Sequence, residues 1–429
     1  MSTSITDTRS AELYARALRV LPGGVNSPVR AMRSIGRDPI FVERGAGAEL
    51  FDVDGNVYVD YVCSWGPLIH GHAHPAILAA VAEAAEHGTT FGAATAGEVE
   101  LAELVASRMP AVDMLRMTSS GTEASMSAIR LARAATGRTK LLKFAGAYHG
   151  HLDGLLAEAG SGLATQGIPS SPGVPEASTA ATVIVPWNDP EAVARAFAEH
   201  DFAAVLAEAY PANMGLVPPA DGFLELLRER ATATGALLVF DEVITGFRIS
   251  PGGAQELSGV LPDLTVMGKV IGGGLPAAAY GGSVELMERI APAGDVYQAG
   301  TLSGNPLAVA AGRTALELLD DEAYARLAAT TRALADGLAD GARQHGVPVQ
   351  VAQTTGLFTV FFSEAPVTDY AGAQACDADR HAAWCRALLA RGVYPPPSQY
   401  EAWFPSLAHT EEHVARTLEA ASAAFAEVA

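Results

Sequence analysis

Between about residues 100 and 300, short apolar runs alternate along the chain with longer amphipathic stretches. Runs that are nearly free of polar side chains are typical of strands in a parallel sheet that helices cover on both faces. The pattern therefore predicts an α/β fold with a large domain built on a mainly parallel sheet. The predicted strands are LLKF (141–144), TVIVP (182–186), AAVLA (203–207), ALLVF (236–240) and LTVM (264–267).

A helix is predicted between two of these strands, over residues 221–234. Phe223, Leu224 and Leu227 share one face of that helix, and Gly235 stands where it should end. Asp221 is the expected N-cap, because a carboxylate accepts hydrogen bonds from the free N–H groups of a first helical turn. These features are typical of a helix that crosses over between parallel strands.

Both ends of the chain differ from this alternating centre. After Gly304 the sequence predicts an Ala-rich helical stretch (306–345), a strand (356–362) and helices near 378–391 and 410–428. We therefore expect a second, smaller α+β domain that both chain ends form. The predicted parts are an N-terminal segment of the small domain (1–55), the large domain (56–305) and the C-terminal small domain (306–429).

Residues 150–180 interrupt the alternation, because they are rich in Gly, Ser and Pro and have no sustained hydrophobic period. Loops of this length inside compact domains are uncommon and often functional. Two interpretations stay open at this point, a mobile lid and a variable surface excursion.

Composition excludes several partners. The formal net charge of -20 repels nucleic acid and anionic membranes, although local positive groups can still bind a small anion. No apolar run reaches the length of about 18 residues that a transmembrane helix needs, and the N-terminus lacks the apolar core of a signal peptide. Cys63, Cys376 and Cys385 form no CxxC pair, so neither a disulfide framework nor a zinc site is indicated. We expect a soluble, cytoplasmic protein.

Two charged residues stand after predicted strands, where parallel sheets place ligands. Asp241 follows ALLVF directly, and Lys269 lies between LTVMG and the glycines 272–274. Alone, Asp241 can be a structural cap and Lys269 a solvated charge. Together they predict that the carboxylate pairs with a pyridinium nitrogen and that a lysine amine of lowered pKa forms a Schiff base.

A third element is the predicted helix within SSGTEASMSAIRLARAATG (119–137), where Ser120 and Glu123 have the spacing of a capping box and Gly137 ends the helix. Gly121 and Thr122 would then lie at the helix N-terminus, where free N–H groups and the helix dipole favour a phosphate. Taken alone, the segment is an ordinary capped helix. The sequence has no G-x-x-x-x-G-K-[ST] loop, which favours a phosphorylated cofactor smaller than a nucleotide.

Aromatic and histidine residues add weaker signals. Tyr148, which precedes His149, can stack on a flat cofactor ring or be a core tyrosine with a satisfied hydroxyl. His70, His72 and His74 have the composition of a metal cluster, but no acidic or cysteine ligand accompanies them in the sequence. We interpret them as a turn leading into a helix and predict no metal.

The segments DEVITGFR (241–248), DLTVMGKVIGGGLP (263–276), SGTEA (120–124) and GTLSGNPLA (300–308) together resemble the class III aminotransferase family of fold-type I pyridoxal-phosphate enzymes. That resemblance implies a seven-stranded, mainly parallel sheet and a pyridoxal or pyridoxamine 5'-phosphate cofactor. Further segments are similar to one branch of the family, among them LPGGVNSPVRA (21–31), CSWGPLIHGHAHP (63–75) and AGAYHGHLDGLLAEAGSG (145–162).

Carried over by position, the resemblance gives each site residue an implied role. Lys269 would carry the cofactor and move protons, Asp241 would pair with the ring nitrogen, and Tyr148 would stack on the ring. Thr301 would reach the cofactor phosphate of a neighbouring subunit, which implies a homodimer with sites at the interface. The remaining implied cofactor residues are Gly121, Thr122, Glu208, Asn213 and Val243, and the implied substrate residues are Ser27, Arg30, Ser161 and Glu401.

The resembled branch converts glutamate 1-semialdehyde, a small amino aldehyde, to 5-aminolevulinate through 4,5-diaminovalerate, an early step of tetrapyrrole synthesis. Since the intermediate must stay bound, the resemblance favours a closing lid at 150–180. The chain departs from the branch in EAYPANMG (208–215), where Ala209, Tyr210 and Ala212 replace the expected residues. A class III transaminase or an aminomutase acting on another amino aldehyde or keto substrate therefore stays open.

Overall fold

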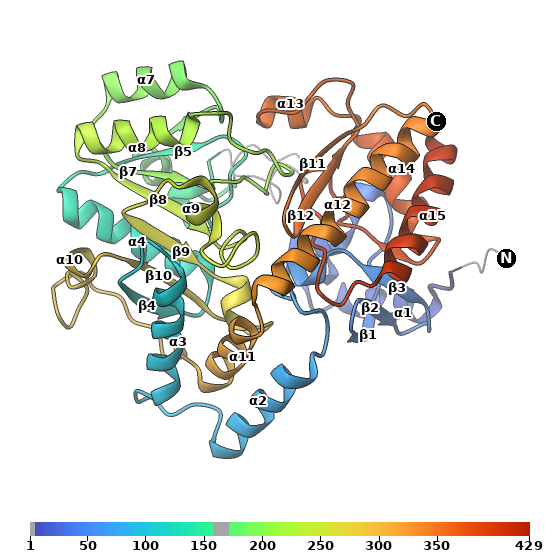
Figure 1. Cartoon of the computed structure of the whole chain (residues 1–429), viewed down its shortest axis with the longest axis horizontal. Coiled ribbons are helices and arrows are strands. Elements are labelled where there is room, and N and C mark those ends of the chain that lie inside the picture. Colours follow the sequence, from blue (N-terminus) through green and yellow to red (C-terminus); the bar gives the residue numbers. More distant parts are fainter. Residues whose placement is uncertain (1–4, 158–170) are drawn as a thin grey trace.

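The computed structural model describes residues 5–157 and 171–429. Figure 1 shows two halves side by side, one built on a large twisted sheet and the other containing both chain ends. The predicted substrate residue Ser161 and the centre of the predicted loop at 150–180 lie outside the described residues.

The large sheet has seven strands in the order β4-β10-β9-β8-β7-β5-β6. Strand β10 is antiparallel to both of its neighbours, and the other pairs are parallel, so the predicted fold class is confirmed. All five predicted strands are present. The seven strands are β4 (Met114–Thr118), β5 (Lys140–Phe144), β6 (Thr182–Val185), β7 (Phe202–Ala207), β8 (Leu237–Glu242), β9 (Leu264–Met267) and β10 (Ala278–Gly282).

Helices cover both faces of this sheet. Successive residues of β7 point to opposite faces, so Val205 packs in the core under α7 and α8 while Leu206 packs in the core under α4. This double burial explains why the strands are apolar throughout. The helices of this half are α2 (Pro75–His87), α3 (Ala96–Arg108), α4 (Gly121–Thr136), α6 (Glu176–Thr179), α7 (Pro190–Glu199), α8 (Phe223–Thr234), α9 (Gly253–Ser258), α10 (Val284–Met287) and α11 (Pro306–Glu317).

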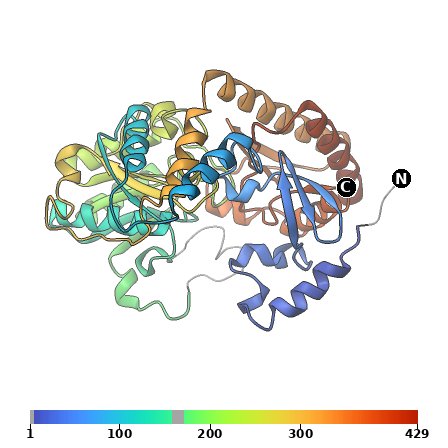
Figure 2. The same cartoon turned by 90° about the horizontal axis from the view of Figure 1, so that it is seen from below.

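The second half joins the two chain ends, as Figure 2 shows from below. Strand β13, from the C-terminal part, pairs with β3 in the sheet β1-β2-β3-β13, and β11 pairs with β12. The strands are β1 (Val42–Ala46), β2 (Glu49–Asp52), β3 (Val57–Asp60), β11 (Gln350–Thr354), β12 (Leu357–Phe361) and β13 (Val393–Tyr394). The α-helices are α1 (Thr8–Ala17), α12 (Asp321–Gln344), α13 (Tyr370–Gln374), α14 (Ala378–Leu389) and α15 (Glu411–Val428).

Short 3-10 helices complete the described elements: η1 (Pro22–Gly24), η2 (Pro28–Ala31), η3 (Arg33–Ile35), η4 (Cys63–Trp65), η5 (Asp153–Leu155) and η6 (Lys269–Gly272). Because β3 pairs with β2, a boundary at 55–56 would divide one sheet. We therefore propose to place the start of the large domain after Asp60.

Two helix predictions need correction. Helix α8 is capped by Gly222 in the left-handed region, and not by Asp221, because the glycine adopts a φ of 77° at no steric cost. The stretch 306–345 is two helices, α11 and α12, since Asp320 starts a new helix by accepting a hydrogen bond from the N–H of Ala323 at 2.8 Å.

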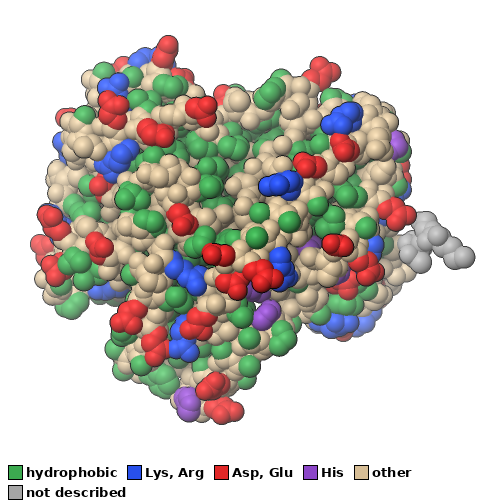
Figure 3. Space-filling view, in the orientation of Figure 1, with side chains coloured by type: hydrophobic (Ala, Val, Ile, Leu, Met, Phe, Trp, Pro, Cys, Tyr) green, Lys and Arg blue, Asp and Glu red, His purple; other side chains and the backbone are tan. Residues whose placement is uncertain are grey.

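The surface carries acidic and basic side chains interspersed over the face drawn in Figure 3. The negative net charge is thus spread across this face and not gathered in one acidic patch. Among the described residues, no helix is long and apolar enough to cross a membrane.

Candidate active site

The carboxyl ends of β7, β8 and β9 open on one cavity of about 210 Å³. Glu208, Asp241 and Lys269 lie within two residues of the ends of these three neighbouring strands, so the sheet itself brings them together. The cavity is lined by Gly121, Thr122, Ser125, Tyr148, His149, Gly150, Glu208, Tyr210, Asn213, Asp241, Val243, Ile244, Thr245 and Lys269.

Asp241 is buried and held by two donors. Its Oδ1 accepts a hydrogen bond from the N–H of Val243 at 3.0 Å, and its Oδ2 lies 2.8 Å from Nδ1 of the buried His149. The donor contacts fix the carboxylate at the cavity wall and compensate for its burial. No role was predicted for His149 from the sequence. The available signal was its position directly after Tyr148, the residue predicted to stack on the cofactor ring.

Glu208 organises the turn beside the cavity. Its Oε1 accepts a hydrogen bond from the N–H of Tyr148 at 3.0 Å, and its Oε2 accepts from the N–H of Ala212 and from Nδ2 of Asn213, both at 2.9 Å. Burial raises the pKa of the Glu208 carboxyl, while these donors oppose the rise. Tyr210 lies half-buried on the cavity wall at the tip of this turn.

Lys269 begins η6 with a φ of 50°, an unfavourable conformation for a residue with a side chain. Burial lowers the pKa of its amine, and the negative charges of Asp241, Glu401 and Glu208 act in the opposite direction. A lowered pKa increases the fraction of neutral amine, the form that attacks a carbonyl. Lys269 is one of three lysines in the chain, and the others, Lys140 and Lys143, do not line this cavity.

The N-terminus of α4 forms part of the cavity wall. Ser120 caps the helix by accepting a hydrogen bond from the N–H of Glu123 at 3.3 Å, as predicted. The reciprocal bond of the predicted capping box falls one residue earlier, because the Glu123 carboxylate accepts from the N–H of Ser119 at 2.8 Å. Gly121 packs closely on Val243, where an added Cβ would lie 3.2 Å from a methyl carbon. The buried hydroxyl of Ser125 has no hydrogen-bond partner within the part of the chain that the structure describes. Free N–H groups and a free hydroxyl at a helix N-terminus suit a phosphate group.

The donor set therefore fits a phosphorylated pyridine cofactor. A carboxylate, an amine and a phosphate-binding helix end surround one cavity, and Tyr148 supplies an aromatic wall. A larger adjacent cavity of about 730 Å³ shares only Thr122 among the described residues, and apolar side chains such as Ile129 and Leu141 form part of its wall. Since it contains neither the lysine nor the buried carboxylates, we place the site in the smaller cavity.

Several predicted residues lie outside this cavity. Arg30 and Thr301 are exposed, and Ser27 is half-buried. Glu401 does not line the cavity wall but is buried, and its charge raises the pKa of Lys269. The roles predicted for these four residues stay predictions.

The histidines of HGHAHP serve the packing between elements. Nε2 of the buried His70 lies 2.8 Å from the carbonyl oxygen of Ala315, and Nε2 of His72 lies 2.7 Å from Oδ2 of Asp60. Across the described ranges, 5–157 and 171–429, no group of three or more His, Cys, Asp and Glu side chains has the geometry of a metal site.

Residues 32–425 match the family model described as aminotransferase class-III, and the chain belongs to this family. A relative in Desulforudis audaxviator (strain MP104C), described as glutamate-1-semialdehyde 2,1-aminomutase, is 57% identical over 97% of both chains. Among solved structures, an ω-transaminase from Sphaerobacter thermophilus superposes with a TM-score of 0.91 at 37% identity, covering 97% of both chains. A glutamate-1-semialdehyde-aminomutase from Pseudomonas aeruginosa PAO1 has a TM-score of 0.87 at 29% identity, covering 98% of this chain and 95% of that chain. The cofactor of this family is pyridoxal phosphate, as the resemblance implied.

Proposed function

We propose that this protein converts glutamate 1-semialdehyde to 5-aminolevulinate by moving an amino group within one substrate skeleton. The observation that supports this most strongly is the 57% identity to an aminomutase along 97% of both chains. The reaction is an early step of tetrapyrrole synthesis, and we propose that the protein works in the cytoplasm.

The cofactor, when bound, supplies an electron-withdrawing ring and an amino group that can be exchanged. In our proposal, Asp241 pairs with the ring nitrogen, Tyr148 stacks on the ring, and the N–H groups at Gly121 and Thr122 hold the phosphate with the Ser125 hydroxyl. Glu208 acts indirectly, since it holds the backbone of Tyr148 and the side chain of Asn213.

Lys269 would bind the cofactor covalently, and its free amine would carry protons between the carbons that lose and gain the amino group. Its lowered pKa suits both tasks, because a neutral amine attacks a carbonyl and accepts a proton. The nearby charges of Asp241, Glu401 and Glu208 oppose that lowering, because negative charges stabilise the protonated amine.

On the substrate side, we assign Ser27, Arg30 and Ser161 to the carboxylate of the substrate, and a guanidinium is suited to that task. Glu401 would disfavour a second, dicarboxylic amino donor by repulsion. Thr301 is exposed in the single chain, which agrees with a contact to the cofactor of a second subunit in a homodimer.

The experiment uses purified protein reconstituted with the aminated cofactor and supplied with glutamate 1-semialdehyde alone. We expect stoichiometric conversion to 5-aminolevulinate over many turnovers, without an amino donor or acceptor, and none with Lys269→Ala. The proposal fails if turnover starts only after a second amino compound is added.

A second candidate is a transaminase that passes nitrogen between two separate substrates. It is favoured by the ω-transaminase structure, which is more similar in sequence than the solved aminomutase, at 37% against 29% identity. Tyr210 on the cavity wall also departs from the aminomutase pattern. This candidate predicts product only when an amine donor and a carbonyl acceptor are both present.

A further inference from the structure

A strained turn, Cys63–Gly66, lies beside the site lysine. Cys63, Ser64 and Trp65 have φ angles of 45°, 58° and 68°, and Gly66 has a φ of 115°. The left-handed region is unfavourable for residues with a Cβ, and three such residues in succession persist only where the surroundings hold them. The structure must therefore contain contacts that keep this turn in place.

The turn forms part of the wall around Lys269. A Cβ added to Gly66 would lie 3.2 Å from Cδ of Lys269 and 3.0 Å from the ring of Phe404, so the backbone approaches the lysine stem closely. The carbonyl oxygen of Gly66 accepts a hydrogen bond from the buried guanidinium of Arg248. A shift of the turn would thus change the space available to the lysine stem.

Asp60 holds the entry to this turn. The residue ends β3 and is 1% exposed. Its Oδ1 accepts a hydrogen bond from the N–H of Val62 at 2.8 Å, and its Oδ2 accepts one from the N–H of Cys63 at 3.1 Å. The carboxylate therefore fixes the two backbone groups that lead into the strained residues.

His72 in turn holds Asp60. Its Nε2 lies 2.7 Å from Oδ2 of Asp60, the oxygen that also receives the N–H of Cys63. The backbone of His72 is fixed by two hydrogen bonds with Gly47, at 2.7 and 3.0 Å. Its ring packs on Gly45, where an added Cβ would come within 2.5 Å of the ring. His72 itself does not line the cavity that contains Lys269.

We propose that His72 is a positioning residue for Lys269, acting through Asp60 and the turn Cys63–Gly66. The role rests on the proposed function, because it concerns how the lysine is placed for amine transfer. It also gives a purpose to one histidine of the HGHAHP motif that is independent of any metal.

Three holoenzyme variants test this role. His72→Ala removes the donor to Asp60. His72→Gln restores a donor, since the amide nitrogen of glutamine can occupy the place of Nε2. The matched control is His70→Ala, which removes a more deeply buried histidine of the same segment that bonds to Ala315 and not to Asp60.

For His72→Ala we expect kcat to fall by about tenfold or more with a smaller change in KM, since a small misplacement of a reacting group slows chemistry strongly. Backbone hydrogen exchange in the turn Cys63–Gly66 should become faster. The pH midpoint of the lysine–cofactor absorption band should rise, because admitted water favours its charged form. In His72→Gln and in His70→Ala, kcat, the backbone exchange of the turn and the absorption midpoint should all stay close to the wild-type values.

The proposal is overturned if His72→Ala leaves the absorption midpoint and the exchange of the turn as in wild type, or if His70→Ala changes them equally. Should the wild-type protein make no 5-aminolevulinate, the proposed function fails, but these two measurements still decide the role of His72.

Discussion

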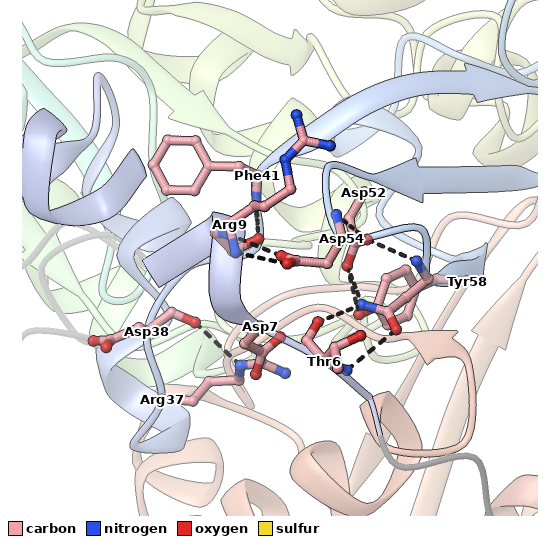
Figure 4. A network of polar contacts seen from close by, with 11 residues as sticks. Thr6, Asp7, Arg9, Arg37, Asp38, Phe41, Asp52, Asp54 and Tyr58 are labelled. Atoms are coloured by element: carbon pink, nitrogen blue, oxygen red, sulfur yellow. Dashed lines mark hydrogen bonds and ion pairs between the residues drawn. The ribbon is translucent and has the colours of Figure 1, made fainter. Parts of the chain in front are cut away.

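The four-stranded and the seven-stranded sheet each have a buried aspartate at or next to the end of a strand, and the two carboxylates have different surroundings. Asp52, at the end of β2, accepts hydrogen bonds from the N–H groups of Asp54 and Asn56, from Nδ2 of Asn56 and from the hydroxyl of Tyr58, at 2.7 to 3.0 Å (Figure 4). Asp241, in β8, accepts only from Val243 and His149 among the described residues.

This difference shows how a buried carboxylate with a structural role can be distinguished from one with a functional role. A carboxylate has about four acceptor positions, and those of Asp52 are filled by the turn that follows it and by Tyr58 of β3. Asp241 keeps acceptor capacity and faces a cavity that also contains Lys269. Counting donors, and not burial alone, therefore distinguishes the two sites.

The largest expected effect is on the cavity side, with Lys269→Ala. Removing the amine abolishes covalent attachment and proton transfer, so the rate should fall on the order of 10⁴-fold or more. Steady-state turnover of glutamate 1-semialdehyde and the visible absorption band measure the two losses. Lys140→Ala is the control. A similar loss in this variant would contradict the assignment of Lys269 as the lysine that binds the cofactor.

Asp241→Asn should come next, with a fall of about 10²-fold or more, since it removes a charge placed to stabilise the reacting system. The same change removes a negative charge that raises the pKa of Lys269, so that pKa should fall further below its usual value. The pH dependence of chemical acylation of the Lys269 amine in the cofactor-free protein follows this shift. A rise in the pKa of Lys269 would contradict the proximity of Asp241 to this amine.

Tyr210→Ala should have a smaller effect, on the substrate selectivity of the cavity that contains Asp241. Removing the half-buried phenol enlarges the wall, so the ratio of kcat/KM for bulkier amino compounds to that for glutamate 1-semialdehyde should rise by about tenfold. Tyr210→Phe keeps the volume and should leave the ratio unchanged. If both variants changed the ratio of kcat/KM values equally, the effect would come from loss of the hydroxyl and not from the larger cavity.

Asp52→Asn should have the smallest effect on activity. The substitution weakens a satisfied buried network, so the free energy of unfolding should fall by about 1–3 kcal/mol while kcat and KM stay as in wild type. Chemical denaturation and steady-state kinetics test the two parts. A loss of activity in a folded variant would remove the contrast with Asp241.

Much of the fold could be predicted from the sequence, because strands buried on both faces are continuous apolar runs. The two remaining strands of the large sheet, β4 and β10, were missed for a physical reason. The sequence of β4, MLRMT, is largely half-exposed, and that of β10, AAYGG, contains two glycines with little strand preference.

The centre of the candidate site could also be predicted, because polar residues directly after buried strands must meet at one sheet edge. Sequence alone could not reveal the partners that join through folding. The contact between His149 and Asp241 joins residues 92 positions apart in the sequence. The series of contacts from His72 through Asp60 to Lys269 depends on a strained turn that no hydrophobic pattern encodes.

The most direct test of the central claim is to find which lysine binds the cofactor. The protein would be incubated with pyridoxal phosphate, reduced with borohydride, digested and mapped by peptide mass spectrometry. With only Lys140, Lys143 and Lys269 in the chain, the assignment is unambiguous. We predict a pyridoxyl group on the peptide containing Lys269 alone; labelling of Lys140 or Lys143 in its place, or no labelling, would contradict the account.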